Sequence, residues 1–294
     1  MPGTPPRLVR NPFRPAGRET VTMQRQETTI REYALVTGAS SGIGYAFAAQ
    51  LAARGYGVVL VSNRDEENRA AAERIAREYG VATLPLRMDL AQPDAAERLY
   101  AETSRCGLEI AVLVSNAGIL LFGLLADTPP ERLRTIVALH CTTPALLCRL
   151  YGDAMRRRGG GRILVVSSST AWMPWPTIAA YAATKAFLHS FARSLDIELR
   201  DEGVTVTTLF PGAVDTPLYT LSERRRRWLV RCGVMLSPEA VARKGLRALF
   251  HGRRRCIPGL FTKLCLFFCR LIPAPWLRPL LRIPAVRRLL QPRG

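Results

Sequence analysis

The chain has 294 residues, of which 48% are hydrophobic, enough to bury one sizeable core in a single domain of α/β size with extensions. Its formal net charge of +19 lies mostly after residue 221, while residues 32–221 are close to neutral, which argues against a nucleic-acid-binding module. The seven cysteines form no C-x-x-C pair, which argues against a disulfide scaffold and any metal site and favours the reducing cytoplasm.

Residues 1–31 are rich in proline and arginine and lack the apolar run of a signal peptide. We expect them to form a flexible arm. The chain begins either at Met1 or at Met23, which lies shortly before the first predicted strand.

Short apolar segments alternate with helical patterns from residue 32 to residue 258. We predict strands over 33–37, 58–62, 82–86, 110–115, 162–167 and 204–210, with a shorter one near 256–257. Continuous apolar strands that alternate with helices form parallel sheets covered on both faces. The sequence therefore predicts one doubly wound, Rossmann-type α/β domain over 32–258.

A glycine-rich turn over residues 37–44 follows the first strand and opens a helix. Gly38 permits a tight turn, Gly42 lets the backbone approach a phosphate, and Gly44 allows close helix packing. The free N–H groups of the helix start then face a pyrophosphate. The alternative is a plain glycine turn. The expected cofactor-binding positions are Gly38, Ser40, Ser41, Gly42, Ile43 and Gly44.

The residues after the second strand determine whether NAD(H) or NADP(H) is preferred. An acid there binds the ribose 2′-OH of NAD(H), and an arginine pairs with the 2′-phosphate of NADP(H). Asn63 and Arg64 stand at this point, so the sequence favours NADP(H). Asp65 leaves NAD(H) open, and Arg64 is otherwise a solvated residue at a helix start.

Tyr181 and Lys185 are four residues apart, which places both side chains on one face of a helix. Ser168 stands thirteen residues before Tyr181. An ammonium beside a phenol stabilises the phenolate and so eases proton loss. The Ser168 hydroxyl can hold a substrate oxygen beside that phenol. The three residues indicate a proton-transfer site for a carbonyl/alcohol pair. The alternative is a helix tyrosine next to a solvated lysine.

Five ordered motifs over 33–258 resemble the short-chain dehydrogenase/reductase family. They are the 37–44 turn, Asp89, residues 115–118, Ser168 with Tyr181 and Lys185, and the 211–216 loop. The resemblance implies that Tyr181 is the general acid/base, that Ser168 orients the substrate oxygen, and that Lys185 binds the nicotinamide ribose. It implies homo-oligomers and further cofactor-binding positions at Asp89, Asn116, Ala117, Gly118, Pro211, Gly212, Val214 and Thr216.

Two positions depart from the family pattern. Ser115 replaces an asparagine, which is a mild change. His140 stands where the family has a helix asparagine that supports a proton-relay water. An imidazole can still bind water and pass protons, so His140 is a candidate catalytic residue. The alternative is a neutral, packed histidine.

Two segments bear on the substrate. Trp172, Met173 and Trp175 lie between the candidate serine and tyrosine and indicate an apolar, fairly large substrate, or else ordinary core packing. Residues 218–235 fall where the family has a mobile lid, and the arginines at 224–227 either attract an anionic substrate or form a solvated face.

Residues 259–294 form a basic extension in which apolar clusters alternate with single cations. Lys263, Arg270 and three prolines interrupt any run long enough to cross a membrane. Such a tail suits an anionic membrane surface on the cytoplasmic side, or else covers the domain or a partner copy.

The sequence therefore predicts an oxidoreductase that moves a hydride between NADP(H), or NAD(H), and a small-molecule carbonyl or alcohol. The alternative is a catalytically silent dinucleotide-binding scaffold or sensor held at a membrane by its tail.

Overall fold

The computed structural model describes residues 32–216 and 228–269. The predicted N-terminal arm, the arginines at 224–227 and the tail from residue 270 lie outside the described residues.

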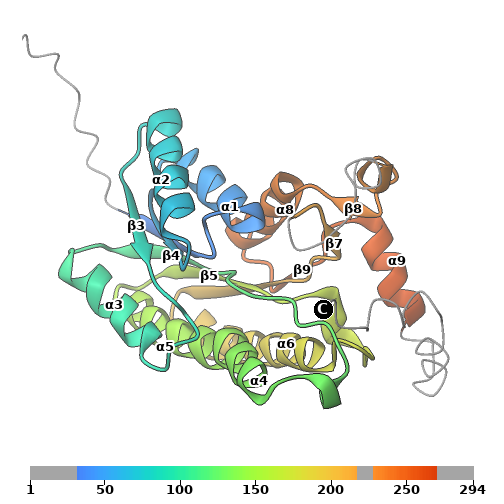
Figure 1. The fold of residues 1–294 in the computed structure, drawn as a ribbon. Coiled ribbons are helices and arrows are strands. Elements are labelled where there is room, and N and C mark those ends of the chain that lie inside the picture. The colour runs from blue at the N-terminus through green and yellow to red at the C-terminus, as the bar shows by residue number, and fades with distance from the viewer. Residues whose placement is uncertain (1–31, 217–227, 270–294) are drawn as a thin grey trace, which may run out of the picture.

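A parallel sheet of seven strands forms the centre of the domain, in the order β3-β2-β1-β4-β5-β6-β9 (Figure 1). The chain starts in the middle, builds outwards to β3, and returns to the other side of β1 with β4. The doubly wound prediction is confirmed. The strands are β1 Tyr33–Thr37, β2 Gly57–Ser62, β3 Thr83–Arg87, β4 Ile110–Ser115, β5 Gly161–Val166, β6 Val204–Leu209 and β9 Arg255–Cys256. A separate pair joins β7 Ala213–Val214 to β8 Met235–Leu236.

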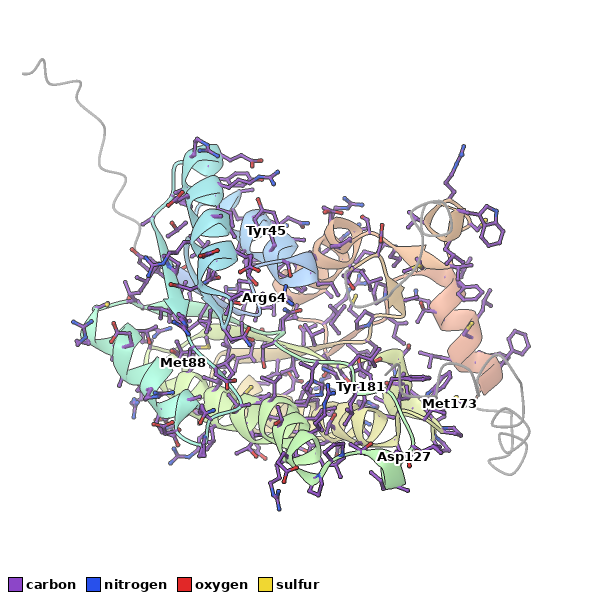
Figure 2. The ribbon with its side chains drawn as sticks, in the orientation of Figure 1. Tyr45, Arg64, Met88, Asp127, Met173 and Tyr181 are labelled. Atoms are coloured by element: carbon purple, nitrogen blue, oxygen red, sulfur yellow. The ribbon has the colours of Figure 1, made fainter. Side chains whose placement is uncertain are left out.

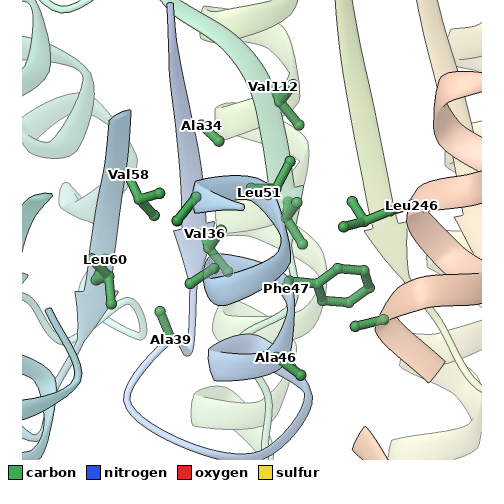
Figure 3. Close-up of a cluster of buried hydrophobic side chains, with 14 of the residues drawn as sticks. Ala34, Val36, Ala39, Ala46, Phe47, Leu51, Val58, Leu60, Val112 and Leu246 are labelled. Carbon is green, nitrogen blue, oxygen red and sulfur yellow. The ribbon is translucent and has the colours of Figure 1, made fainter. Parts of the chain in front are cut away.

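Helices cover both faces of this sheet (Figure 1). One face carries α1 Gly42–Ala52, α2 Asp65–Tyr79 and α8 Pro238–Phe250, and the other carries α3 Ala95–Arg105, α5 Thr143–Arg157 and α6 Ala179–Arg200. Figure 3 shows Phe47 of α1 reaching across the first layer toward Leu246 of α8, and both side chains are fully buried. The apolar residues of the strands supply both cores, which explains why their runs are continuous rather than alternating.

Further helical segments stand outside these layers. Helix α4 Pro130–Val137 leads through a π turn over Ala138–Thr142 into α5. Helix α9 Leu260–Cys269 lies at the edge of the molecule beyond β8 (Figure 1). Across residues 32–216 and 228–269, every helix is too short or too polar to cross a membrane.

Asp196 ties α6 to the sheet edge from inside the protein. Its side chain is 1% exposed and accepts a bidentate pair from Arg200, with Nη2 2.7 Å from Oδ1. Arg254, which precedes β9, approaches the second oxygen at 3.0 Å. The backbone N–H of Val206 in β6 donates to the same carboxylate at 3.0 Å. One buried anion thus joins a helix and two neighbouring strands.

We predict that Asp196→Ala lowers the free energy of unfolding by about 3 kcal/mol, because the Val206 N–H and two guanidinium groups lose their partner. Urea denaturation followed by circular dichroism measures the change. The matched control is Asp153→Ala, which removes a surface carboxylate that pairs with Arg156 and Arg157. The control should lose much less stability. Equal losses in the two variants would contradict the stabilising role of the Asp196 network.

Candidate active site

The predicted site residues gather at one edge of the sheet, where the parallel strands end. Gly38 follows β1, Asn116 follows β4, and Ser168 and Pro211 follow β5 and β6. The strand order reverses between β1 and β4, and ligands of open α/β sheets bind outside the carboxyl ends at such a point.

The glycine-rich turn has the shape that a phosphate cradle needs. Gly38 and Gly42 adopt the left-handed region, with φ of 67° and 57°. A Cβ at Gly44 would collide with the Gly38 carbonyl and lie 2.7 Å from the Asn116 amide nitrogen. Ser41 precedes α1 without a side-chain cap, so its hydroxyl leaves the first N–H groups of the helix to a ligand. The turn therefore fits the pyrophosphate of a dinucleotide.

Thr37 and Asn116 join this turn to the loop after β4. The Thr37 hydroxyl accepts the backbone N–H groups of Asn116 and Ala117 at 2.9 and 3.0 Å. In return the Asn116 side-chain amide donates to the Thr37 carbonyl at 2.9 Å. These bonds hold the two central strand ends together. Sequence reasoning used Thr37 only as the start of the turn and missed its hydroxyl.

Arg64 stands at the amino end of α2, at the border of the turn. Figure 2 shows it close to α1 and α2, above the sheet, with Tyr181 on α6 below. Ser62 bonds to the Ser40 hydroxyl at 2.9 Å and accepts the Arg64 backbone N–H at 3.2 Å. The Arg64 side chain is exposed and forms no ion pair with another described residue. It can therefore reach a phosphate beside Ser40, whereas Asp65 pairs with Arg69 at 3.1 Å.

Asn63 and Asp89 follow β2 and β3, on the same side of the sheet as Arg64. Both residues are exposed. The Asp89 carboxylate accepts the backbone N–H of Ala91 at 3.0 Å and the side chain of Gln92 at 3.1 Å, so it caps its own turn while remaining open to solvent.

Ser168, Tyr181 and Lys185 come together at the end of β5. The Lys185 Nζ donates to the carbonyl of Val166 at 3.1 Å, and the Ser167 hydroxyl donates to the Lys185 carbonyl at 2.7 Å. These bonds place the ammonium 5.7 Å from the centre of the Tyr181 ring. Lys185 is 4% exposed, and burial lowers its pKa to about 8. Ser168 is 7% exposed, and its oxygen accepts the Thr170 backbone N–H at 3.2 Å.

His140 lies in the π turn, and both of its ring nitrogens have protein partners. Nε2 accepts the backbone N–H of Ile119 at 3.0 Å, so the proton belongs on Nδ1, which faces the Thr184 hydroxyl at 3.0 Å. Thr184 in turn donates to the carbonyl of Tyr181 at 2.8 Å. Burial, and secondly the charge of Lys185, lowers the pKa of His140 to about 2. This geometry favours a neutral, packed histidine over a ligand of relay water.

Gly118 makes this arrangement feasible, because a Cβ there would lie 2.7 Å from the His140 Nε2. His140 also lies in a π turn, a type of turn that is often found at functional sites. Sequence reasoning flagged His140 and Gly118 but missed Thr184. Its contact with His140 joins residues 44 positions apart, and single-sequence spacing carries no signal for it.

The loop after β6 closes the other side of the turn. Thr216 lies against Gly42, where a Cβ would meet the Thr216 methyl carbon at 3.3 Å. Pro211 and Val214 are buried. Gly212 makes room for Thr262 of α9, whose hydroxyl would collide with a Cβ at that position. The start of the predicted tail thus packs directly on the candidate cofactor loop, a contact that the sequence did not indicate.

The aromatic segment before Tyr181 divides into two parts. The Trp172 ring packs 4.4 Å from His189 and 5.3 Å from Phe210, measured between centroids, so it belongs to a packed cluster. Met173 lies toward α9 in Figure 2. The Trp175 indole nitrogen is buried and has no hydrogen-bond partner among the described residues. Met173 and Trp175 remain available to line a substrate site.

The short chain dehydrogenase family model matches residues 32–227. A 17-beta-hydroxysteroid dehydrogenase type 3 of Mus musculus is 32% identical over 192 residues, which cover 65% of this chain. A very-long-chain 3-oxoacyl-CoA reductase-B of Danio rerio is 32% identical over 195 residues, again 65% of this chain. The chain spans 62% of the length of each relative.

A solved structure of a short-chain dehydrogenase from Sphingobium yanoikuyae, in complex with NADPH, has a similar fold. Its TM-score is 0.70 at 25% identity, and the match covers 90% of this chain and 98% of the other.

We predict that His140 makes folding sensitive to acid. Its imidazole stays neutral in the folded state and takes up a proton on unfolding once the pH falls below 6.5, its ordinary pKa. This contribution is fully present above that pH, and below it the free energy of unfolding should fall by about 1.4 kcal/mol per pH unit.

Urea denaturation between about pH 6 and 5 measures this slope in the unsubstituted chain and in His140→Asn. The slope should be shallower in the variant. Identical slopes would mean that the imidazole already titrates normally in the folded protein.

Proposed function

Since the chain belongs to the short-chain dehydrogenase family, we propose that it is an NADP(H)-dependent oxidoreductase of apolar ketones or acyl-type carbonyl compounds and their alcohols. One observation carries this proposal. Lys185 is held by Val166 with its ammonium beside the Tyr181 ring, at the same sheet edge as the dinucleotide cradle.

The chain's own residues fit a dinucleotide along this edge. The glycine turn with Ser40, Ser41 and Ile43 takes the pyrophosphate, and Arg64 with Asn63 takes the 2′-phosphate. Asp89 and the loop over residues 116–118 border the adenosine, and the loop from Pro211 to Thr216 borders the nicotinamide. When bound, NADP(H) supplies or accepts the hydride.

Tyr181 handles the proton. In reduction its hydroxyl gives a proton to the carbonyl oxygen, and in oxidation the phenolate takes one from the alcohol. The nearby ammonium of Lys185 favours the phenolate and so makes the transfer easier in both directions. The Ser168 hydroxyl holds the substrate oxygen in reach, because the Thr170 N–H fixes the serine oxygen from the other side.

His140 acts in this scheme as a positioning residue. It connects Ile119, next to the adenosine loop, with Thr184, one turn from Tyr181. A relay through its side chain would need one of these two hydrogen bonds to break.

The choice of substrate rests on the pocket and on the relatives. Met173 and Trp175, in the segment between Ser168 and Tyr181, are half-buried and offer apolar surface, which suits a large apolar substrate. The two curated relatives are named for a hydroxysteroid and for very-long-chain 3-oxoacyl-CoA, and each of these compounds carries a large apolar part. We therefore assign a substrate of that class rather than a small polar one.

Assembly and location belong to the same proposal. We expect homo-oligomers, since Phe187 leaves apolar surface exposed on α6 and stacks on Phe191. We expect a cytoplasmic protein with free cysteines, six of which are described. The basic residues 259–294 are expected to contact the inner face of an anionic membrane.

We predict that Tyr181→Phe lowers kcat at least roughly a hundredfold, because only the proton donor is lost. NADPH and NADH oxidation is measured across ketones, aldehydes and 3-oxoacyl thioesters. NADPH binding, followed by fluorescence, should stay close to that of the unsubstituted chain. Tyr79→Phe, at the far end of α2, should leave kcat unchanged.

Retained turnover in Tyr181→Phe would refute the assigned role. NADPH binding without turnover of any compound, even in the unsubstituted chain, would instead support a catalytically silent scaffold.

We predict that Arg64→Ala reduces the preference for NADPH over NADH, expressed as the ratio of kcat/KM values, roughly tenfold or more, because one charge-assisted phosphate contact is lost. Arg77→Ala removes an exposed arginine in the last turn of the same helix and serves as the control. An unchanged ratio in Arg64→Ala would show that Arg64 is merely solvated.

A further inference from the structure

Helix α9 presents an unusually apolar outer face. Five large side chains on this ten-residue helix are between 46% and 73% exposed. We call them the α9 outer face: Leu260, Phe261, Leu264, Phe267 and Phe268. Their spacing of three, four and seven residues places them on one side of the helix. An apolar patch of this kind on a folded domain marks a contact surface.

The opposite side of α9 is fixed to the active-site region. Thr262 and Leu266 are 7% and 8% exposed, and Thr262 fills the space that Gly212 leaves open. Gly259 packs on Leu236 of β8. The outer face is therefore carried by a helix that the domain holds in place.

The sequence that contains α9 carries only positive charge. Residues 240–294 contain no aspartate or glutamate. Lys263 falls at the border of the outer face by helical period, and six arginines follow between residues 270 and 294. A lysine in this position can keep its stem on apolar surface while its ammonium reaches polar headgroups.

A second copy of the chain fits this face poorly. A two-fold interface pairs the same surface patch of both copies, so α9 of the second copy offers no negative charge to complement Lys263. Anionic phospholipid headgroups complement these cations, and the acyl region just below them accepts phenylalanine and leucine side chains.

We propose that α9 seats the protein on an anionic bilayer through the α9 outer face, and that the enzyme takes its substrate from that bilayer. The second part rests on the proposed function. Because the inner side of α9 contacts the 211–216 loop, seating it on a membrane brings the nicotinamide side of the site next to the lipid. A bilayer-dissolved ketone or acyl compound then reaches Tyr181 without crossing water.

The first test is co-sedimentation of the full chain with mixed phosphatidylcholine and phosphatidylglycerol vesicles. Binding is expected at low salt and should weaken at high salt, because screening reduces the attraction of the cations. Phe267→Ser with Phe268→Ser should weaken binding roughly tenfold or more, since two apolar side chains no longer enter the acyl region.

The matched control is Ile197→Ser with Val137→Ser, which removes two exposed apolar side chains, 70% and 47% exposed, from other helices. The control should bind like the unsubstituted chain. Equal binding by all three chains, or no binding by any, would overturn the bilayer seat. If the Phe267/Phe268 variant loses an oligomer in sedimentation velocity but binds vesicles like the unsubstituted chain, the α9 outer face instead makes contact between copies of the chain.

A second measurement separates this proposal from the catalytic one. Tyr181→Phe should bind vesicles normally, so loss of catalysis and loss of the bilayer seat appear in different assays. Turnover of a long-chain 2-alkanone dissolved in vesicles should fall in the Phe267/Phe268 variant, while turnover of a short water-soluble ketone should not. A parallel fall with both ketones would overturn supply from the bilayer.

Discussion

The pairing of Thr37 with the loop after β4 is the contact on which the rest of the site depends. Parallel strands β1 and β4 lie side by side, but the chain continues from β1 toward β2 and from β4 toward β5, on opposite sides of the sheet. These diverging connections open a crevice at the carboxyl ends of the two strands. The Thr37 hydroxyl and the Asn116 amide bridge that crevice at its base. Gly44 then has no room for a side chain, since Asn116 and the Gly38 carbonyl occupy it. The glycine pattern is thus a consequence of this pairing as much as of the cofactor.

A second tie joins the substrate side to the cofactor side. His140 connects Ile119 with Thr184, and Thr184 holds the backbone of Tyr181. Lys185, one turn further along α6, is fixed to the end of β5 by two hydrogen bonds, one to Val166 and one from Ser167. The helix that carries Tyr181 and Lys185 is therefore fixed at both ends of this turn by bonds within the protein.

Much of this arrangement follows from sequence pattern. The apolar strands, the order of the motifs and the gathering of their residues at strand ends were predicted, because periodicity and parallel topology decide them. The partners of His140 were not, since they lie 21 and 44 residues away and meet only through folding. Trp172 was placed either at the pocket or in the core, and only tertiary packing against His189 and Phe210 separates these. Thr262 at Gly212 is a contact between segments fifty residues apart, for which single-sequence spacing carries no signal.

The π turn over Ala138–Thr142 has a consequence for how this chain tolerates insertions and deletions. A π turn holds one residue more than an α turn. Deleting a single residue there would let α4 and α5 merge into one regular helix and would rotate α4 about its axis by roughly 100° relative to α5. The side of α4 that packs on α6 would turn outward, and His140 would swing away from Thr184. The length of this segment is therefore as strictly encoded as the identity of the residues within it.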